Sequence, residues 1–236
     1  MKMALPKFAV FCIALALSAG AGLHCATAAP ADFDGVWVPD VKDQHRQEAQ
    51  NVPPWKPEIV PQIQRLIAEE NAGRPFLVLS HCLPHGMPTW MLISHNAFEW
   101  LTTPGRVTML GEVDGNRMRR IYTDGRVLPK DPDLTLHGYS IGHWDGDALV
   151  VDTVGFNDRS WLGGLGGGPV PHTEMLHMTE RYRRVDFGHM EATIAFEDPG
   201  TFVKPFHMNV KLNLAPREEV MEYVCENNRP EHLVGN

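Results

Sequence analysis

Three Asp-Gly pairs constrain the fold of this chain more than any other feature of its sequence. Each pair stands between short runs of residues that favour β-structure: Asp114-Gly115, Asp124-Gly125 and Asp145-Gly146. Asp-Gly favours a two-residue hairpin turn because both central positions need a positive φ, which Gly adopts without steric cost and Asp tolerates. The sequence therefore predicts antiparallel strands joined by tight turns, without the spacing of alternating strands and helices.

The hydrophobic pattern predicts a first strand at 32–37 and about ten further strands in sequential order from residue 89 onward. These strands are predicted at 90–95, 97–103, 106–113, 117–123, 138–144, 147–155, 174–185, 190–197, 204–213 and 218–225. A meander of this length protects its edges by closing into a barrel. We therefore expect a mainly β fold: a single antiparallel up-and-down barrel of the calycin type.

One helix is predicted near the N-terminal end of the barrel domain, at 62–72. Ile63, Leu66 and Ile67 follow the i, i+3, i+4 spacing of a helix face, and Gly73 follows as a stop signal.

The first residues of the chain are typical of a secretory signal. Lys2 and Lys7 give a positive start, residues 8–17 are uninterruptedly apolar, and Ala26-Thr27-Ala28 fits a cleavage site. The apolar run is too short for a membrane anchor, because a spanning helix needs about 20 apolar residues. The sequence thus predicts a signal peptide over 1–28 and a protein that is periplasmic or secreted.

The remaining residues, 29–236, are predicted to form one barrel domain. The full chain has a formal net charge of −8, and removing a signal that carries two lysines and no acid makes it more acidic. An acidic chain without a basic run argues against nucleic acid and anionic membrane surfaces as partners. We expect a small-molecule partner and no membrane insertion after cleavage, whereas the sequence leaves the oligomeric state open.

Two cysteines, Cys82 and Cys225, remain after the signal has removed Cys12 and Cys25. Two thiols in an oxidising compartment are expected to pair, so a Cys82–Cys225 disulfide is predicted. Mass spectrometry of the mature protein under non-reducing conditions checks this, and two free thiols would contradict it.

Several stretches of the chain resemble known proteins. Gly35-Val36-Trp37 resembles the G-x-W that opens lipocalins and wider calycins, which implies an up-and-down barrel. Most of the mature chain resembles a large group of exported bacterial proteins without an assigned function. The runs that carry this second resemblance are GYSIGHWDGDALVVDTVGFNDRSW (138–161), PHTEMLHMTERYRR (171–184), HCLPHGMP (81–88), RRIYTDGR (119–126) and EYVCEN (222–227).

Because that group has no assigned function, the resemblance implies no catalytic residue in this chain. One difference between this chain and the pattern of the group is informative. Many of its members read G-H-S-x-G-R-W where this chain has Tyr139 and His143 in place of the histidine and the arginine. A proton donor at this position would here be a phenol, or an imidazole four residues further along.

The strongest candidate site lies in residues 171–184. His172 and Glu174 are two positions apart, so on a strand they would project from one face. Such a pair can act as an acid/base couple, or as two ligands of a divalent metal. A structural alternative is that the two residues cap the loop and pair with a nearby arginine.

Four further residues are candidates. Asp152 lies on an apolar strand, where a carboxylate either has a pKa suited to proton transfer or pairs with an arginine. Tyr139 and His143 share one face of their strand. Arg120 and His143 are predicted to bind substrate, with Arg120 holding an anionic part of it.

Together these residues favour an exported barrel enzyme that performs cofactor-free acid/base chemistry on a small, partly apolar molecule, as a lyase, dehydratase or isomerase. His172 would be the general base or acid, Glu174 would orient it, and Asp152 and Tyr139 would be second proton-handling groups. The alternatives are a lipocalin-like carrier and a metal-dependent hydrolase that uses His172 and Glu174. The sequence contains no Walker, dinucleotide-binding or H-E-x-x-H motif.

Overall fold

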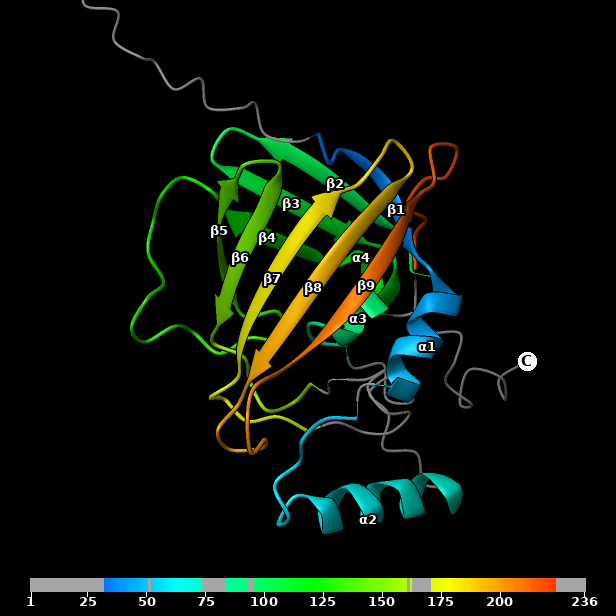
Figure 1. Ribbon diagram of the computed structural model, residues 1–236, viewed down its shortest axis with the longest axis vertical. Coiled ribbons are helices and arrows are strands. Elements are labelled where there is room, and N and C mark those ends of the chain that lie inside the picture. The colour runs from blue at the N-terminus through cyan, green and yellow to red at the C-terminus, as the bar shows by residue number, and fades with distance from the viewer. Residues whose placement is uncertain are drawn as a thin grey trace, which may run out of the picture.

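Nine β-strands close into a barrel that is flanked by short helices (Figure 1). The computed structural model describes residues 32–50, 52–73, 84–92, 96–160, 162 and 171–223. The mainly β, single-barrel prediction is confirmed. The predicted signal peptide and both cysteines of the predicted disulfide lie outside the described residues. Within the described ranges, no helix is both long enough and apolar enough to cross a bilayer.

Each strand neighbours the next, and the last strand pairs with the first. The strands are β1 (Gly35–Pro39), β2 (Phe98–Thr103), β3 (Arg106–Gly111), β4 (Met118–Tyr122), β5 (Tyr139–Asp145), β6 (Ala148–Val154), β7 (His177–Arg184), β8 (His189–Glu197) and β9 (Phe206–Leu214). Trp37 of β1 lies opposite Phe98 on one side and Leu214 on the other, which closes the barrel. The helices are α1 (Val41–Gln50), α2 (Val60–Asn71), α3 (Thr89–Leu92) and α4 (Val113–Asn116).

The barrel departs from the antiparallel pattern between β4 and β5, which run parallel. Their register has only two pairs, Ile121 with Ser140 and Tyr122 with Ile141. Residues 123–138 carry the chain back along the barrel between these strands, as the green loop in Figure 1 shows. Parallel neighbours need such a crossover, whereas antiparallel strands can be joined by a two-residue turn.

The three Asp-Gly pairs have three different outcomes. Asp145 pairs with Ala148 across a tight β5–β6 turn, so the predicted hairpin is confirmed. Its two turn residues are Gly146 and Asp147, one position later than predicted, and of these only Gly146 has a positive φ, of 64°. Gly125 has φ 82° but begins the long crossover, so the hairpin predicted there is wrong. Gly115 lies within α4 with φ 79°, and α4 forms a wider β3–β4 connection than expected.

The helix predicted at 62–72 is confirmed as α2, but the strand predicted at 90–95 is wrong over 90–92, because residues 89–92 form α3. Its apolar run was ambiguous, since periodicity cannot separate a short buried strand from a short buried helix. The strand predicted at 218–225 is also wrong over 218–223, which form none. Helix α1, which was not predicted, lies against β9 (Figure 1).

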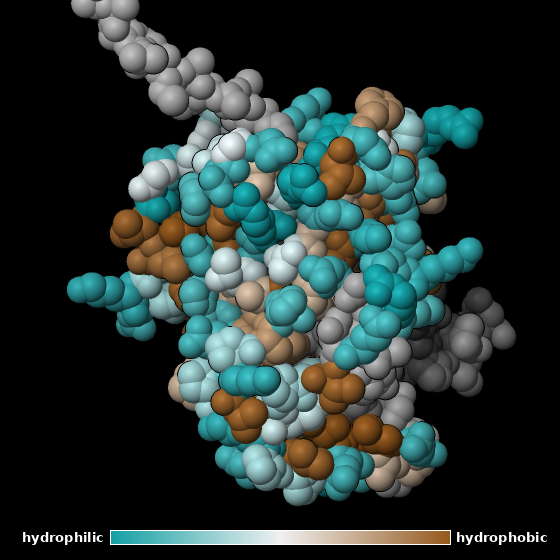
Figure 2. Space-filling view, in the orientation of Figure 1, coloured by the Kyte–Doolittle hydropathy of each residue, from teal (hydrophilic) through white to brown (hydrophobic). Residues whose placement is uncertain are grey.

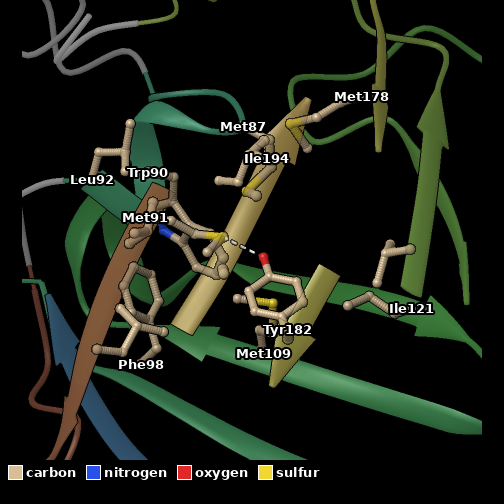
Figure 3. Packing of buried hydrophobic residues seen from close by; sticks show 14 of the residues in the cluster. Met87, Trp90, Met91, Leu92, Phe98, Met109, Ile121, Met178, Tyr182 and Ile194 are labelled. Carbon is tan, nitrogen blue, oxygen red and sulfur yellow. Dashed lines mark hydrogen bonds between the residues drawn. The ribbon is translucent and has the colours of Figure 1, made fainter. Parts of the chain in front are cut away.

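The interior of the barrel is filled by large side chains. Trp90, Met91 and Leu92 of α3 are all buried, and the phenol oxygen of Tyr182 on β7 lies 3.1 Å from Met91 Sδ (Figure 3). Helix α3 thus adds side chains to a core that the inward faces of the strands already supply.

A buried ion pair crosses this interior. Arg119 of β4 is 2 % exposed and Glu180 of β7 is fully buried. Arg119 Nη1 donates to Glu180 Oε1 over 2.9 Å, and Nη2 donates to the other carboxylate oxygen. The guanidinium also donates to the hydroxyls of Ser140 (3.1 Å) and Thr153 (2.9 Å), and Tyr182 donates to Glu180. Both charges are therefore paired and hydrogen-bonded, as buried charges must be.

Candidate functional site

A cavity of about 520 Å³ lies at the end of the barrel where β6 ends and β7 begins. Four segments line it: Asp158 and Ser160 after β6, residues 171–175 before β7, Thr201 between β8 and β9, and the region around the start of α2. Helix α2 lies beyond this lower end of the barrel (Figure 1). Figure 2 shows hydrophobic residues gathered at the same end of a mostly hydrophilic face.

His172 is the central titratable residue of the cavity. It is 4 % exposed, and its Nε2 lies 2.8 Å from the Oγ of Ser160, which is 1 % exposed. Its Nδ1 lies 3.1 Å from the backbone carbonyl oxygen of Thr173. Burial lowers the pKa of His172, and this effect outweighs the Thr173 carbonyl and the charges of Asp198 and Asp158, which raise it.

These contacts define the tautomer of His172. A carbonyl oxygen can only accept, so Nδ1 must carry the ring proton. Because the lowered pKa keeps the imidazole neutral near pH 7, Nε2 is then an acceptor, and the Ser160 hydroxyl donates to it. The Ser160 hydroxyl is therefore hydrogen-bonded to a neutral base, His172, and the Thr173 carbonyl orients that base.

Asp198 holds the backbone that orients His172. It is 1 % exposed and follows β8. Its Oδ2 accepts from Thr173 N (2.6 Å), and its Oδ1 accepts from Thr173 Oγ1 (2.7 Å) and Gly200 N (2.9 Å). A Cβ on Gly200 would lie 2.5 Å from Thr173 Cγ2, so only glycine permits this approach. The β8–β9 loop therefore positions the carbonyl that His172 needs.

Replacing Asp198 with alanine is expected to lower the free energy of unfolding by about 2–3 kcal/mol, because three donors lose a buried acceptor. Urea unfolding measures this change, and NMR titration of His172 should show an altered pKa. The matched control is Asp158→Asn at the exposed rim, which should change stability by less than about 0.5 kcal/mol. An Asp198→Ala variant as stable as wild type would contradict the positioning role.

His172 and Glu174 do not lie on one face of a strand as predicted. Both line the cavity, but residues 173–176 form a turn and β7 begins only at His177, so the expected shared strand face is wrong. Asp198 accepts two hydrogen bonds from Thr173 at this bend of the chain. His172 on one side of Thr173 is buried, and Glu174 on the other side is exposed. The Thr173 carbonyl contacts His172 in the place expected for the Glu174 carboxylate.

Asp152 lies on the outer face of β6 and does not line this cavity. It is half-buried there, because Leu149, Val151 and Thr153 take the buried face. Its carboxylate lies 3.3 Å from His177 Nε2 and accepts from Thr179 Oγ1 over 3.1 Å. The expected apolar surroundings are thus wrong, and the observed partner is a histidine, not an arginine.

Tyr139 and Arg120 line a different cavity, at the β4–β5 seam. His143 is exposed on β5 and lines neither of the two cavities. The structure therefore brings together His172 with Glu174, and Tyr139 with Arg120, in two separate places.

Sequence reasoning missed Ser160, Thr173 and Asp198. Ser160 reaches His172, and Asp198 reaches Thr173, through loops whose paths the sequence does not reveal. Thr173 contributes its backbone carbonyl, which no residue type signals. It also missed the Arg119–Glu180 pair, for which a signal existed. Glu180 alternates with Met178 and Tyr182 on one face of a strand, which places it inside the barrel.

Comparisons with known proteins find no match for this chain among family models, curated proteins or solved structures.

Proposed function

We propose that this protein is an exported enzyme in which His172 performs proton transfer on a small, partly apolar molecule bound in the cavity beside α2. The observation that carries the proposal is the hydrogen bond between Ser160 Oγ and the neutral imidazole of His172. Cofactor-free acid/base chemistry suits this pair, as in a lyase, dehydratase or isomerase.

The chemistry follows from the tautomer. Nε2 of His172 has a lone pair and takes a proton, either directly from the substrate or from Ser160 as Ser160 takes one from the substrate. The resulting imidazolium keeps its Nδ1–H bond to the Thr173 carbonyl and returns the proton later in the reaction. Asp198 and Asp158 stabilise the charged form, since both raise the pKa of His172.

The shape and surface of the cavity support a small, partly apolar substrate. Its volume of about 520 Å³ lies within the usual range for small-molecule sites. Ile59 and Met175 supply apolar lining, whereas Asp158, Gln62 and Glu174 supply polar groups. Such a mixture allows the site to orient a substrate while burying its apolar part.

The two alternative functions have weaker support. A lipocalin-like carrier would hold its ligand inside the barrel, where large side chains and an ion pair occupy the space. A metal-dependent hydrolase needs a ligand set, and the described residues contain no group of three or more His, Cys, Asp or Glu placed to hold an ion. Both ring nitrogens of His172 are also engaged.

A second candidate function is acyl transfer with Ser160 as nucleophile. The specific observation in its favour is that the Ser160 hydroxyl already donates to an oriented neutral base. A fluorophosphonate would then label Ser160 with a defined mass increase, and His172→Gln would abolish the labelling. Acid/base catalysis without a serine nucleophile predicts no label on Ser160.

The proposal is tested by incubating wild type and His172→Gln with small-molecule extracts and comparing the products by mass spectrometry. A compound transformed by wild type and left intact by the variant supports the enzyme. If wild type transforms nothing and instead retains one compound unchanged through purification, the protein is a carrier and the proposal fails. Circular dichroism shows whether the variant is folded.

A further inference from the structure

A second cavity, of about 390 Å³, lies where β4 and β5 diverge. The two strands pair only at Ile121 and Tyr122, so residues 117–120 and 135–138 separate beyond that point. The cavity occupies this separation, and its lining shares no residue with that of the His172 cavity. The parallel seam therefore creates a groove that a regular antiparallel barrel would not have.

The groove is positively charged in an acidic protein. Among the residues that the structure describes, its lining includes Arg117 and Arg120 and no Asp or Glu. The buried Arg119 forms part of the lining, but Glu180 neutralises it and its other donors bind Ser140 and Thr153. Arg120 is exposed, and among the described residues its guanidinium has no ion-pair partner. Arg120 is thus available to an external anion.

Aromatic rings form one side of the groove. Tyr122 and Tyr139 stack across the seam with their centroids 5.6 Å apart, and the Arg126 guanidinium lies 3.7 Å from the centre of the Tyr122 ring. Asp124 holds Arg126 through hydrogen bonds of 2.6–3.3 Å. Together these contacts form a preorganised platform for a planar apolar group.

The phenol of Tyr139 is already oriented within this platform. Its oxygen accepts from Arg126 Nη1 over 3.1 Å. A phenol has one O–H, and since Arg126 occupies an acceptor position, that hydrogen is available as a donor. Arg120 and Tyr139 therefore offer an ionic donor and a neutral donor to the same groove.

We propose that the β4–β5 groove is a second ligand site that binds a small aromatic carboxylate, with the carboxylate at Arg120 and Tyr139 and the ring beside Met118, Leu136 and Tyr122. A carboxylate accepts hydrogen bonds from a guanidinium and a phenol together, and a planar apolar body suits the remaining lining. This site does not depend on the chemistry at His172.

Benzoate is the probe for this site, with benzyl alcohol as its neutral analogue and benzylamine as its cationic one. Isothermal titration should show saturable binding of benzoate to wild type and none of either analogue. Arg120→Gln should weaken benzoate binding by about tenfold or more, because it removes a hydrogen bond to a charged group. Tyr139→Phe should weaken it by about three- to tenfold, because it removes a neutral donor.

Two controls locate the binding. Arg217→Gln removes an exposed arginine that does not line the groove, and it should leave benzoate affinity unchanged. His172→Gln should likewise leave it unchanged, since His172 lines the other cavity. The proposal is overturned if wild type does not bind benzoate saturably, if Arg120→Gln binds it as tightly as wild type, or if His172→Gln abolishes the binding. Because Arg120 is exposed, its variant is expected to fold, which a thermal melt checks.

Discussion

Replacing Glu180 with alanine is expected to lower the free energy of unfolding by about 3–5 kcal/mol, because it leaves the Arg119 guanidinium charged and without its counter-ion inside the barrel. The hydroxyls of Ser140 and Thr153 keep their bonds to Arg119 but carry no charge to balance it. Urea unfolding followed by circular dichroism measures the change.

Two comparison variants show whether burial is the cause. Glu191→Ala removes an exposed carboxylate 3.8 Å from Arg183, and it should cost less than about 1 kcal/mol. The double variant Arg119→Met, Glu180→Leu removes both buried charges and should recover most of the loss, since an apolar pair of similar volume replaces them. If Glu180→Ala costs no more than Glu191→Ala, the buried pair does not stabilise the barrel as described.

The same network predicts a loss of stability at alkaline pH. Burial and the neighbouring Glu180 raise the pKa of Tyr182 well above 10.0, and the Arg119 charge only partly opposes them. Above pH 10.0 the unfolded chain releases the phenol proton while the folded chain keeps it, so stability falls as pH rises toward the pKa of the folded state. Above pH 10.0, the free energy of unfolding measured in urea should fall less steeply with rising pH for Tyr182→Phe than for wild type.

If His172 is the general base, as proposed, His172→Gln is expected to lower turnover of the substrate by about 10²–10⁴-fold while leaving substrate affinity largely intact, because it removes that base and not the binding surface. Steady-state kinetics on the compound found in the extract screen measure both quantities. Glu174→Gln is the matched control: it alters a neighbouring, exposed residue of the same cavity and should change turnover far less. Equal losses in the two variants would contradict the assignment of His172 as the base.

The pH dependence of this activity has a defined sign. Burial lowers the pKa of His172 from 6.5, so the neutral base persists below that value and the acid limb of kcat/KM should lie below pH 6.5. The same shift stabilises the folded protein above pH 6.5, and this contribution disappears as pH falls through the lowered pKa. An acid limb of kcat/KM above pH 6.5 would mean that a group other than His172 controls the activity.

The barrel could be predicted because its strands obey a local rule. Alternation in segments such as Phe206–Leu214 places apolar side chains on one face, and hairpin turns then bring successive strands together. The β4–β5 crossover could not be predicted in this way. Asp124-Gly125 supplies the positive φ that a hairpin needs, but the chain uses it to start a long connection, and only the completed sheet determines which strand β4 meets.

The site was predictable only where one residue type implies a role. His172 was found because an imidazole is suited to proton transfer near neutral pH, whatever its surroundings. Ser160 and Asp198 were not found, because serine and aspartate are ordinary loop residues until the fold places them beside His172 and Thr173. Asp152 was misplaced for the opposite reason: both faces of β6 are largely apolar, so alternation did not show which of them faces inward.

Closure of the barrel has a consequence for how the protein is made. β1 lies between β2 and β9, and β9 is the last strand of the described chain. A ribosome delivers β1 long before β9, so one edge of β1 has no partner during most of synthesis. Unpaired strand edges readily associate with other chains, and contacts between distant residues form slowly. The growing chain therefore carries an aggregation-prone edge that is protected only when the final strand arrives.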